Sequence, residues 1–151
     1  MPVDQVLDFD AADTDELILM WRKSFEYEMG IIDPNPLNQQ RVYFEAEIRP
    51  KTRVQVVKRQ GKLVAFLAAH ERYLAQLYVR VDCSGQGLGS MLLRLAKEQS
   101  SGSLSLHTLV RNERARRFYE HHGFQVVGFD YEPIWKLESV EYRWCGPASA
   151  A

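Results

Sequence analysis

The feature that most constrains the fold is a glycine-dense loop between an apolar run and an amphipathic stretch. Its sequence is Ser84-Gly85-Gln86-Gly87-Leu88-Gly89-Ser90. Glycine has no Cβ, so the backbone can turn tightly here and approach a ligand closely. A helix that begins in this loop presents its first N–H groups without internal partners, at the positive end of its dipole. The stretch therefore predicts a strand, a loop and a helix that together bind an anion, most often a phosphate.

Two familiar nucleotide loops differ from this one. A Walker loop ends in Gly-Lys-Ser/Thr, whereas Gly89 is followed directly by Ser90. A dinucleotide fingerprint needs an acidic residue about twenty positions later, and that region reads Ser103-Leu104-Ser105-Leu106. From this loop alone, a tight turn that only connects two elements remains an alternative interpretation.

The composition is typical of a single globular domain. The 151 residues are 46% hydrophobic and 26% charged, and we expect one domain over 1–145 with a flexible tail over 146–151. A net charge of −1 gives no reason to expect nucleic acid or an anionic membrane as partner. We see neither a membrane span nor a signal peptide. Cys83 and Cys145 form no metal-ligand or disulfide pattern, so we expect no metal and a cytoplasmic location.

Before the glycine loop, the periodicity predicts one strand, two helices and three further strands. Their ranges are 5–9, 13–29, 36–48, 52–59, 62–70 and 73–81. Asp13 and Glu16 have the spacing of a capping box at the start of the first helix, and Gly30 is a suitable terminator. The strand at 62–70 is nearly all apolar, which predicts burial on both of its faces.

After the loop, the pattern predicts a helix, a strand, a second helix and two strands. Their ranges are 87–99, 103–110, 112–122, 124–131 and 136–144. Asn112 is a good N-cap for the second of these helices, and Gly123 a good terminator. The order is that of an α/β protein with a mixed sheet. A doubly wound dinucleotide fold has its glycine loop after the first strand, whereas this loop follows the fourth.

The loop and the segment from Asn112 to Phe124 together resemble the GNAT superfamily of acyl-CoA-dependent N-acyltransferases. The loop is similar to the family's Gln/Arg-x-x-Gly-x-Gly/Ala pattern, with Gly87 and Gly89 at the glycines and Ser84 departing from the first position. The segment resembles the pattern Asn-x-x-Ala-x-x-Phe-Tyr-x-x-x-Gly-Phe. The resemblance implies one domain with a mixed, mostly antiparallel sheet, splayed between the fourth and fifth strands and flanked by about four helices.

The resemblance also implies acetyl-CoA as co-substrate. Backbone N–H groups of the loop would hold its diphosphate, and the backbone of 77–79 would pair with the pantetheine arm. We expect Ser84 to weaken this binding at most. The cofactor-binding residues implied are Leu77, Tyr78, Val79, Ser84, Gly85, Gln86, Gly87, Leu88, Gly89, Ser90, Asn112 and Phe118.

Tyr119 and His107 are the catalytic residues that we expect. By resemblance the Tyr119 hydroxyl faces the CoA sulfur and protonates the leaving thiolate, which a phenol with a pKa near 10 can do. His107 lies five positions before Asn112, where peptide-modifying relatives carry a Glu, and its imidazole titrates near neutral pH. A histidine hydrogen-bonded within the sheet is the competing interpretation. Alternative bases are Glu26, Glu28 and Glu71, each more simply interpreted as solvated surface charge.

The expected acceptor is a primary amine of a small molecule or a peptide. The family's acceptor region here holds aromatic and acidic residues, a combination that suits a cationic amine. They are Trp21, Phe25, Tyr27, Tyr73, Tyr131, Trp135, Glu26, Glu28, Asp33, Asp130 and Glu132. A non-catalytic CoA-binding regulatory module and an unrelated nucleotide-binding protein remain alternatives, and the last strands could pair in a homodimer.

Overall fold

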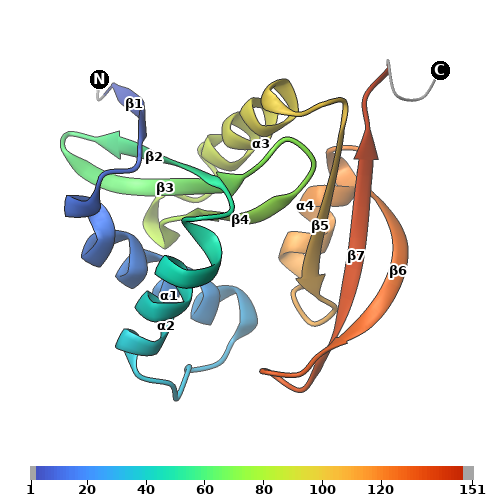
Figure 1. Cartoon of the computed structure of the whole chain (residues 1–151), viewed down its shortest axis with the longest axis horizontal. Coiled ribbons are helices and arrows are strands. Elements are labelled where there is room, and N and C mark those ends of the chain that lie inside the picture. The colour runs from blue at the N-terminus through green and yellow to red at the C-terminus, as the bar shows by residue number, and fades with distance from the viewer. Residues whose placement is uncertain (1–2, 148–151) are drawn as a thin grey trace.

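The computed structural model describes residues 3–147, and within them the strands form two sheets (Figure 1). The first sheet has the order β1-β2-β3-β4 and is antiparallel throughout. Its strands are β1 (Asp4–Asp8), β2 (Arg53–Arg59), β3 (Lys62–Ala69) and β4 (Leu74–Val79). The second sheet has the order β5-β7-β6 and is also antiparallel. Its strands are β5 (Ser103–Leu109), β6 (Gln125–Glu132) and β7 (Leu137–Cys145).

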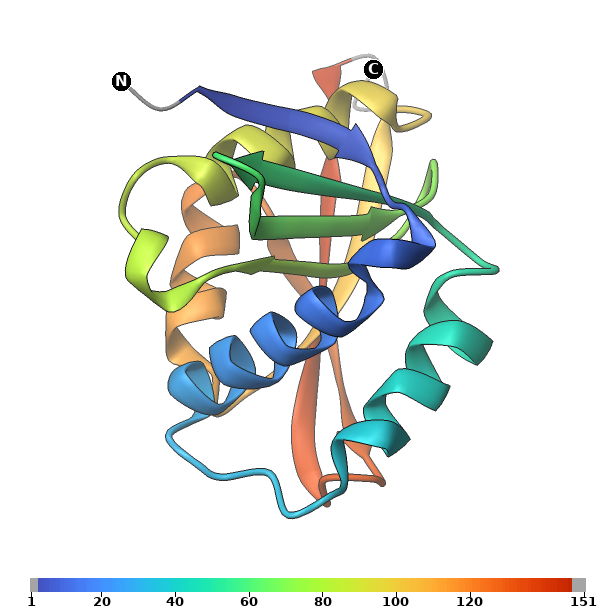
Figure 2. The ribbon, with the colours of Figure 1, turned by 90° about the vertical axis from the view of Figure 1, so that its left-hand side faces the viewer.

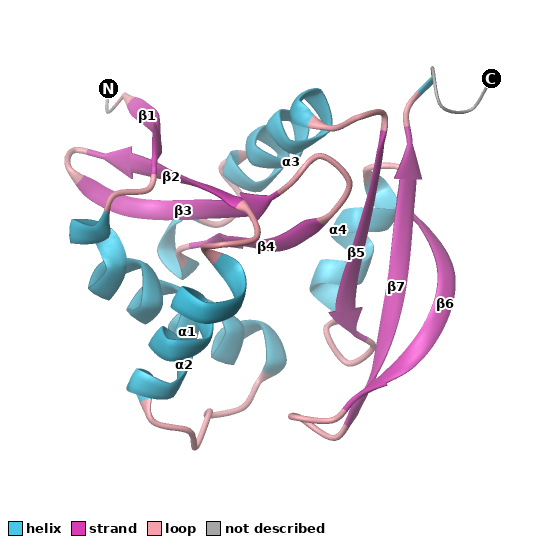
Figure 3. Ribbon diagram, viewed as in Figure 1, coloured by secondary structure: helices cyan, strands magenta, loops and turns pink. Residues whose placement is uncertain are grey.

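Four α-helices connect and cover these sheets in the described part of the chain, as the colours of Figure 3 show. They are α1 (Thr14–Met29), α2 (Leu37–Tyr43), α3 (Leu88–Gln99) and α4 (Glu113–His121). Gly30 ends α1 in the left-handed conformation, with φ of 67°. Asn112 caps α4 by accepting a hydrogen bond from the Ala115 N–H at 3.0 Å. The element order, the end of α1 at Gly30 and the cap of α4 at Asn112 are therefore those that the sequence predicts.

The two sheets part where β4 meets β5. A single isolated parallel bridge, between Tyr73 and Ser105, connects these strands among the described residues. Beyond that bridge the strands diverge, as Figure 1 shows, and in Figure 2 the strands of the first sheet run across the view while those of the second sheet run almost vertically behind them. The predicted splay between the fourth and fifth strands is confirmed.

Two clusters of buried side chains hold the fold together. The larger one lies under α3 and α4 and joins the two sheets, with Leu67, Leu92, Leu104 and Tyr142 all fully buried. The smaller one lies between α1, the segment after α2, and the strands β2 and β3. β3 contributes to both clusters and is buried from its second residue to its last, which confirms the prediction from its apolar sequence.

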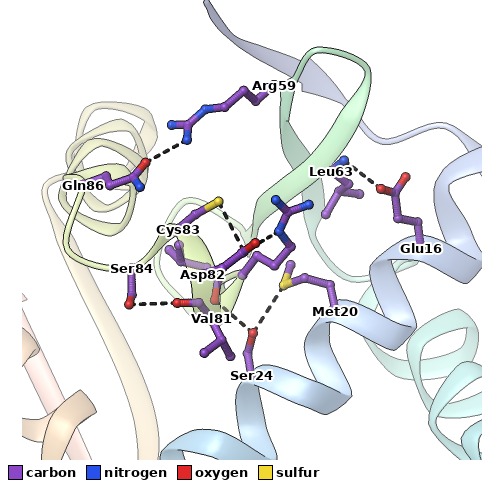
Figure 4. A network of polar contacts seen from close by, with 12 residues as sticks. Glu16, Met20, Ser24, Arg59, Leu63, Val81, Asp82, Cys83, Ser84 and Gln86 are labelled. Carbon is purple, nitrogen blue, oxygen red and sulfur yellow. Dashed lines mark hydrogen bonds and ion pairs between the residues drawn. The ribbon is translucent and has the colours of Figure 1, made fainter. Parts of the chain in front are cut away.

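The predicted capping box at Asp13 and Glu16 is wrong. Asp10 instead accepts from the Ala12 N–H at 2.9 Å and caps the single 3₁₀ turn that precedes α1. The two predicted partners are taken by other groups. Asp13 pairs with Lys58 at 2.7 Å, and Glu16 accepts from the Leu63 N–H at 2.9 Å (Figure 4). A capping box is still present one turn earlier, between Asp10 and Asp13, in which the Asp13 carboxylate accepts from the Asp10 N–H at 3.2 Å, and Glu16 takes no part in it.

The second predicted helix changes its winding part-way. After Tyr43 the chain continues as a π-helix over Phe44–Ile48, in which the Arg49 N–H donates to the Phe44 carbonyl at 2.9 Å. Phe44 and Ile48, the first and last residues of this π-helix, are both buried.

The ends of the chain are only partly described. Gly146 donates its N–H to the Gly102 carbonyl at 2.7 Å, whereas the rest of the predicted tail from residue 148 lies outside the described residues. Within residues 3–147, every helix is too short or too polar to cross a membrane.

Candidate active site

The glycine loop adopts a backbone that side chains would strain. Gly85 and Gly87 have φ angles of 77° and 85°, in the left-handed region that favours glycine. Gly87 is the N-cap of α3, so the free N–H groups at the start of that helix lie directly after it. The predicted strand, loop and helix are all present, and the loop lies at the end of β4.

Gly89 lies on the packed side of the loop. A Cβ at this position would lie 3.4 Å from the Phe118 ring and 3.8 Å from a Val79 methyl group. The first turn of α3 therefore packs directly between β4 and α4, which brings the glycine loop and the helix that carries Tyr119 into contact.

Polar side chains secure the loop from outside (Figure 4). The Ser84 hydroxyl donates to the Val81 carbonyl at 2.9 Å, and the Gln86 amide oxygen accepts from Arg59 at 2.7 Å. On the other side, the Ser24 hydroxyl of α1 donates to the Val79 carbonyl at 2.9 Å. These bonds hold the end of β4 while the loop's backbone N–H groups stay available for a ligand.

A cavity of about 290 Å³ opens where the two sheets part. It is bounded by β4, the glycine loop, α4 and the end of α1. All the cofactor-binding and catalytic residues that the sequence predicts line it, with one exception. The exception is Gln86, whose side chain lies with Arg59 on the outside of the loop.

Tyr119 is deeply placed in this cavity. It is 7% exposed and packs edge-on against Phe118 and Phe124. Burial, and after it the nearby Glu28 carboxylate, raises the pKa of the Tyr119 hydroxyl above its usual value. The hydroxyl is therefore protonated at neutral pH and is a hydrogen-bond donor toward the cavity.

Glu28 lines the same cavity, and its interpretation as solvated surface charge is wrong. The side chain is half-buried, and loss of hydration raises the pKa of its carboxyl group to about 7. Asn112 and Arg114 face it and partly offset this rise. The sequence carried a signal for this placement, because Glu28 falls at helical spacing from the buried Trp21 and Ser24.

His107 stands at the edge of the cavity. Its Nδ1 atom lies 3.0 Å from the Tyr73 hydroxyl, and its Nε2 atom lies 3.9 Å from a Glu141 carboxylate oxygen. The side chain is 45% exposed. The imidazole is therefore oriented by a neighbour but still open to a ligand.

A second cavity, of about 370 Å³, adjoins the first. It lies between α1, α2 and the turn that joins β6 to β7. The two cavities share wall residues from β4, β5 and the start of α4: Ala75, Gln76, Tyr78, His107, Thr108 and Asn112. Two ligands could thus meet at His107 and Asn112, one from each cavity.

The loop between α1 and α2 forms one wall of the second cavity and is tightly held. Arg22 pairs with Asp33 at 3.3 Å and donates to the Asn35 carbonyl at 2.9 Å. Glu26 accepts from the Asp33 N–H at 2.7 Å. Glu26 therefore shapes this loop, and its interpretation as solvated charge is also wrong.

Two arginines of α4 point elsewhere. Arg116 donates to the Tyr142 hydroxyl at 3.0 Å, and Arg117 lies 3.8 Å from Glu113 on the helix surface. Neither lines a cavity. Within residues 3–147, no three His, Cys, Asp or Glu side chains are grouped closely enough to bind a metal ion.

Comparison with known proteins decides the family. The protein-family model of the acetyltransferase (GNAT) domain matches residues 50–126, about half of the chain, and this match includes the glycine loop and α4. The chain belongs to the GNAT acetyltransferase family. It is therefore an N-acetyltransferase, and acetyl-CoA is the acyl donor of this family. The predicted family, fold and enzyme class are confirmed.

Individual relatives agree with this assignment. Peptidyl-lysine N-acetyltransferase YjaB of Salmonella typhimurium is 27% identical over 115 residues, which cover 76% of this chain and 78% of that protein. The solution structure of apo YjaB from Escherichia coli superimposes with a TM-score of 0.79 at 18% identity, covering 95% of this chain and 99% of that one. PaiA N-acetyltransferase from Thermoplasma acidophilum, crystallised with coenzyme A, has a TM-score of 0.73 at 15% identity, with 95% and 99% coverage.

Proposed function

We propose that this enzyme transfers the acetyl group of acetyl-CoA to a primary amine of a peptide or a small molecule. One observation carries the proposal: two cavities with different walls meet at His107 and Asn112. The first has an anion-binding loop at one end and Tyr119 in its wall, and the second has aromatic and acidic walls. The naming of a similar protein as a peptidyl-lysine N-acetyltransferase supports an amine acceptor.

The first cavity fits acetyl-CoA. The N–H groups after Gly87 and the positive end of α3 would bind the diphosphate, since glycines 85, 87 and 89 keep that surface free of side chains. The backbone of β4 that faces the gap would accompany the pantetheine arm toward Tyr119. Asn112 would lie beside the acyl end, near the second cavity.

Acetyl-CoA supplies a thioester whose acetyl carbon accepts a nucleophile. In the proposed reaction the amine nitrogen bonds to that carbon, and the carbon–sulfur bond breaks. The amine attacks in its neutral form, after its ammonium group has lost one proton to solvent. His107 takes the second proton that the nitrogen loses and later releases it to solvent. Tyr119 gives its proton to the sulfur and regains one from solvent, so the net reaction releases one proton.

Of the two candidate bases, we assign proton acceptance to His107. It lines both cavities, whereas Glu28 lines only the first. Glu28 would act on its neighbours through its charge, because burial and, after it, the Glu28 carboxylate raise the pKa values of Tyr119 and Tyr78. A CoA-binding module without turnover is the alternative function, and Ser84 in place of Gln or Arg is the feature that favours it.

Thiol release from acetyl-CoA tests the proposal. We expect release with lysine peptides, polyamines or other primary amines, and none with the matched N-methylated or N-acetylated compounds. Binding of acetyl-CoA without thiol release across the whole panel would favour the regulatory module. A thermal-shift series with CoA, acetyl-CoA, ATP and NAD checks donor binding separately.

A further inference from the structure

The second cavity has an aromatic wall assembled from three separate parts of the chain. On one side Phe25 of α1 packs on Trp135 of the β6–β7 turn, with ring centroids 5.1 Å apart. On the other side Trp21 lies 6.5 Å from Tyr43. Aromatic faces attract ammonium groups and also pack well on an alkyl chain.

The charges in this wall do not cancel. Its charged residues are Arg22, Asp33 and Glu132, together with the titratable His107. Arg22 and Asp33 neutralise one another and are nearly buried, with 11% and 9% of their side chains exposed. Glu132 accepts from the Trp135 N–H at 2.5 Å and has no ion-pair partner within 4.0 Å in the described part of the chain. With His107 neutral, the wall therefore carries one uncompensated negative charge, at Glu132.

That charge lies far from the point where the two cavities meet. Across the second sheet, Glu132 pairs with Leu137 of β7, and His107 pairs with Glu141 of the same strand. Four residues along β7 and two strand spacings across the sheet separate the two Cα atoms by about 16 Å. Both side chains lie on the same face of the sheet, because their β7 partners are four residues apart, so the Glu132 carboxylate and the His107 imidazole are separated by on the order of 10–16 Å.

We propose that the second cavity takes an elongated amine with two positive charges. One primary amino group lies at His107 for acetylation, and the second cationic group binds the Glu132 carboxylate and the Trp135 ring. This inference rests on the proposed acetyl transfer and names its acceptor class. A polyamine and a peptide lysine with a basic residue close by share this chemistry.

The test compares ligands matched in length but differing in the second charge. Calorimetry measures the binding of 1,8-diaminooctane, 1,4-diaminobutane and octylamine to the CoA-saturated enzyme, and thiol release follows their acetylation. A blocked Lys-Gly-Arg peptide and its Lys-Gly-Gln counterpart form the peptide arm. The variant is Glu132→Gln. The matched control is Glu138→Gln, which removes the same charge from the exposed start of β7, outside both cavities.

In the wild-type enzyme and in Glu138→Gln, we expect 1,8-diaminooctane to bind about tenfold more tightly than octylamine. Glu132→Gln should abolish that difference without changing octylamine binding, and 1,4-diaminobutane should be insensitive to the variant. The arm with the larger Glu132-dependent effect identifies a polyamine or a peptide as the source of the amine.

Equal binding of the diamine and the monoamine, or equal effects of the two variants, would overturn the proposed second cation site. Glu132-dependent binding with no acetylation would keep the site and contradict the proposed acetyl transfer. Acetylation of both ligands with no dependence on Glu132 would contradict the second cation site and keep the proposed acetyl transfer. The two proposals can therefore fail separately.

Discussion

Two acidic groups in the first cavity, Tyr119 and Glu28, have raised pKa values. Tyr119 is buried within packed aromatic rings, and Glu28 reaches the same space from α1. Each loses hydration there, so the pKa of each lies above its usual value. The chemistry that we propose depends on Tyr119 keeping its proton until the thiolate leaves, and the negative charge of Glu28 favours that.

Replacement of Tyr119 by Phe tests its role as proton donor. We expect kcat to fall about 100-fold, because a positioned acid typically contributes a factor of that order. The affinity for acetyl-CoA should stay the same, since the ring remains. Steady-state kinetics and calorimetry measure the two effects. Tyr131→Phe is the control, because Tyr131 is 56% exposed and lines neither cavity. Unchanged kcat in Tyr119→Phe would remove it from the acid role.

The ligand-free enzyme should lose stability as the pH rises, because of Glu28. Its carboxyl pKa is raised from 4.5 to about 7, so between these values the folded protein binds more protons than the unfolded chain. The stabilisation is complete below pH 4.5 and is lost as the pH rises through 7. A rise in pKa from 4.5 to about 7 corresponds to a contribution of about 3 kcal/mol.

Urea unfolding at several pH values measures how the free energy of unfolding changes with pH in the wild type and in Glu28→Gln. The amide does not titrate, so the variant should show a flatter decline between pH 5 and pH 8 than the wild type. Identical pH profiles would mean that Glu28 is well hydrated.

At the scale of elements, the glycine loop and α4 form one unit. Gly89 packs on Phe118, and Ser90 Oγ lies 3.1 Å from His122 Nε2 at the C-terminal end of α4. The loop that we expect to bind the diphosphate is thus fixed to the helix that carries Tyr119. A displacement of the loop would reach the proposed acid directly.

Gly87→Val should abolish acetyl-CoA binding, with an affinity loss of more than about tenfold. A β-branched residue at φ of 85° is strained by about 1–3 kcal/mol, and relief of that strain would move the N–H groups at the start of α3. Calorimetry with acetyl-CoA gives the affinity. Gly128→Val is the matched control, because Gly128 lies in β6 with open space around its Cβ position. Retained affinity in Gly87→Val would contradict the loop assignment.

At the scale of the molecule, one core joins the two sheets at their closed end and leaves the other end to the cavities. Leu104 of β5 is fully buried in that core, together with Leu67 of β3 and Leu92 of α3. The two sheets should therefore unfold as one unit, although among the described residues a single bridge, from Tyr73 just before β4 to Ser105, links β4 to β5. A homodimer and a single domain over 1–145 stay predictions.

Leu104→Ala tests this cooperativity. We expect a loss of about 2–5 kcal/mol in the free energy of unfolding, typical of a buried leucine. Circular dichroism and tryptophan fluorescence should report one coincident transition, as in the wild type. Leu19→Ala, at a position that is 44% exposed, should change stability by much less. Two separate transitions in the wild type would contradict a common core.

Much of this architecture could be predicted because local patterns determine it. The positions of the glycines, the Asn112 cap and the apolar β3 segment each follow from a few neighbouring residues. The ion pair between Asp13 and Lys58 could not be predicted, because Lys58 lies in a strand far along the chain. The environment of Glu28 and the walls of the second cavity likewise depend on segments that only the folded chain brings together.

The meeting of the two cavities also bears on the order of events in turnover. The acyl donor would enter beside the glycine loop and the acceptor between α1, α2 and the β6–β7 turn, so neither has to leave before the other arrives. Both can be held at once, and the acetyl group can pass directly between them. No side chain needs to carry it in a covalent intermediate.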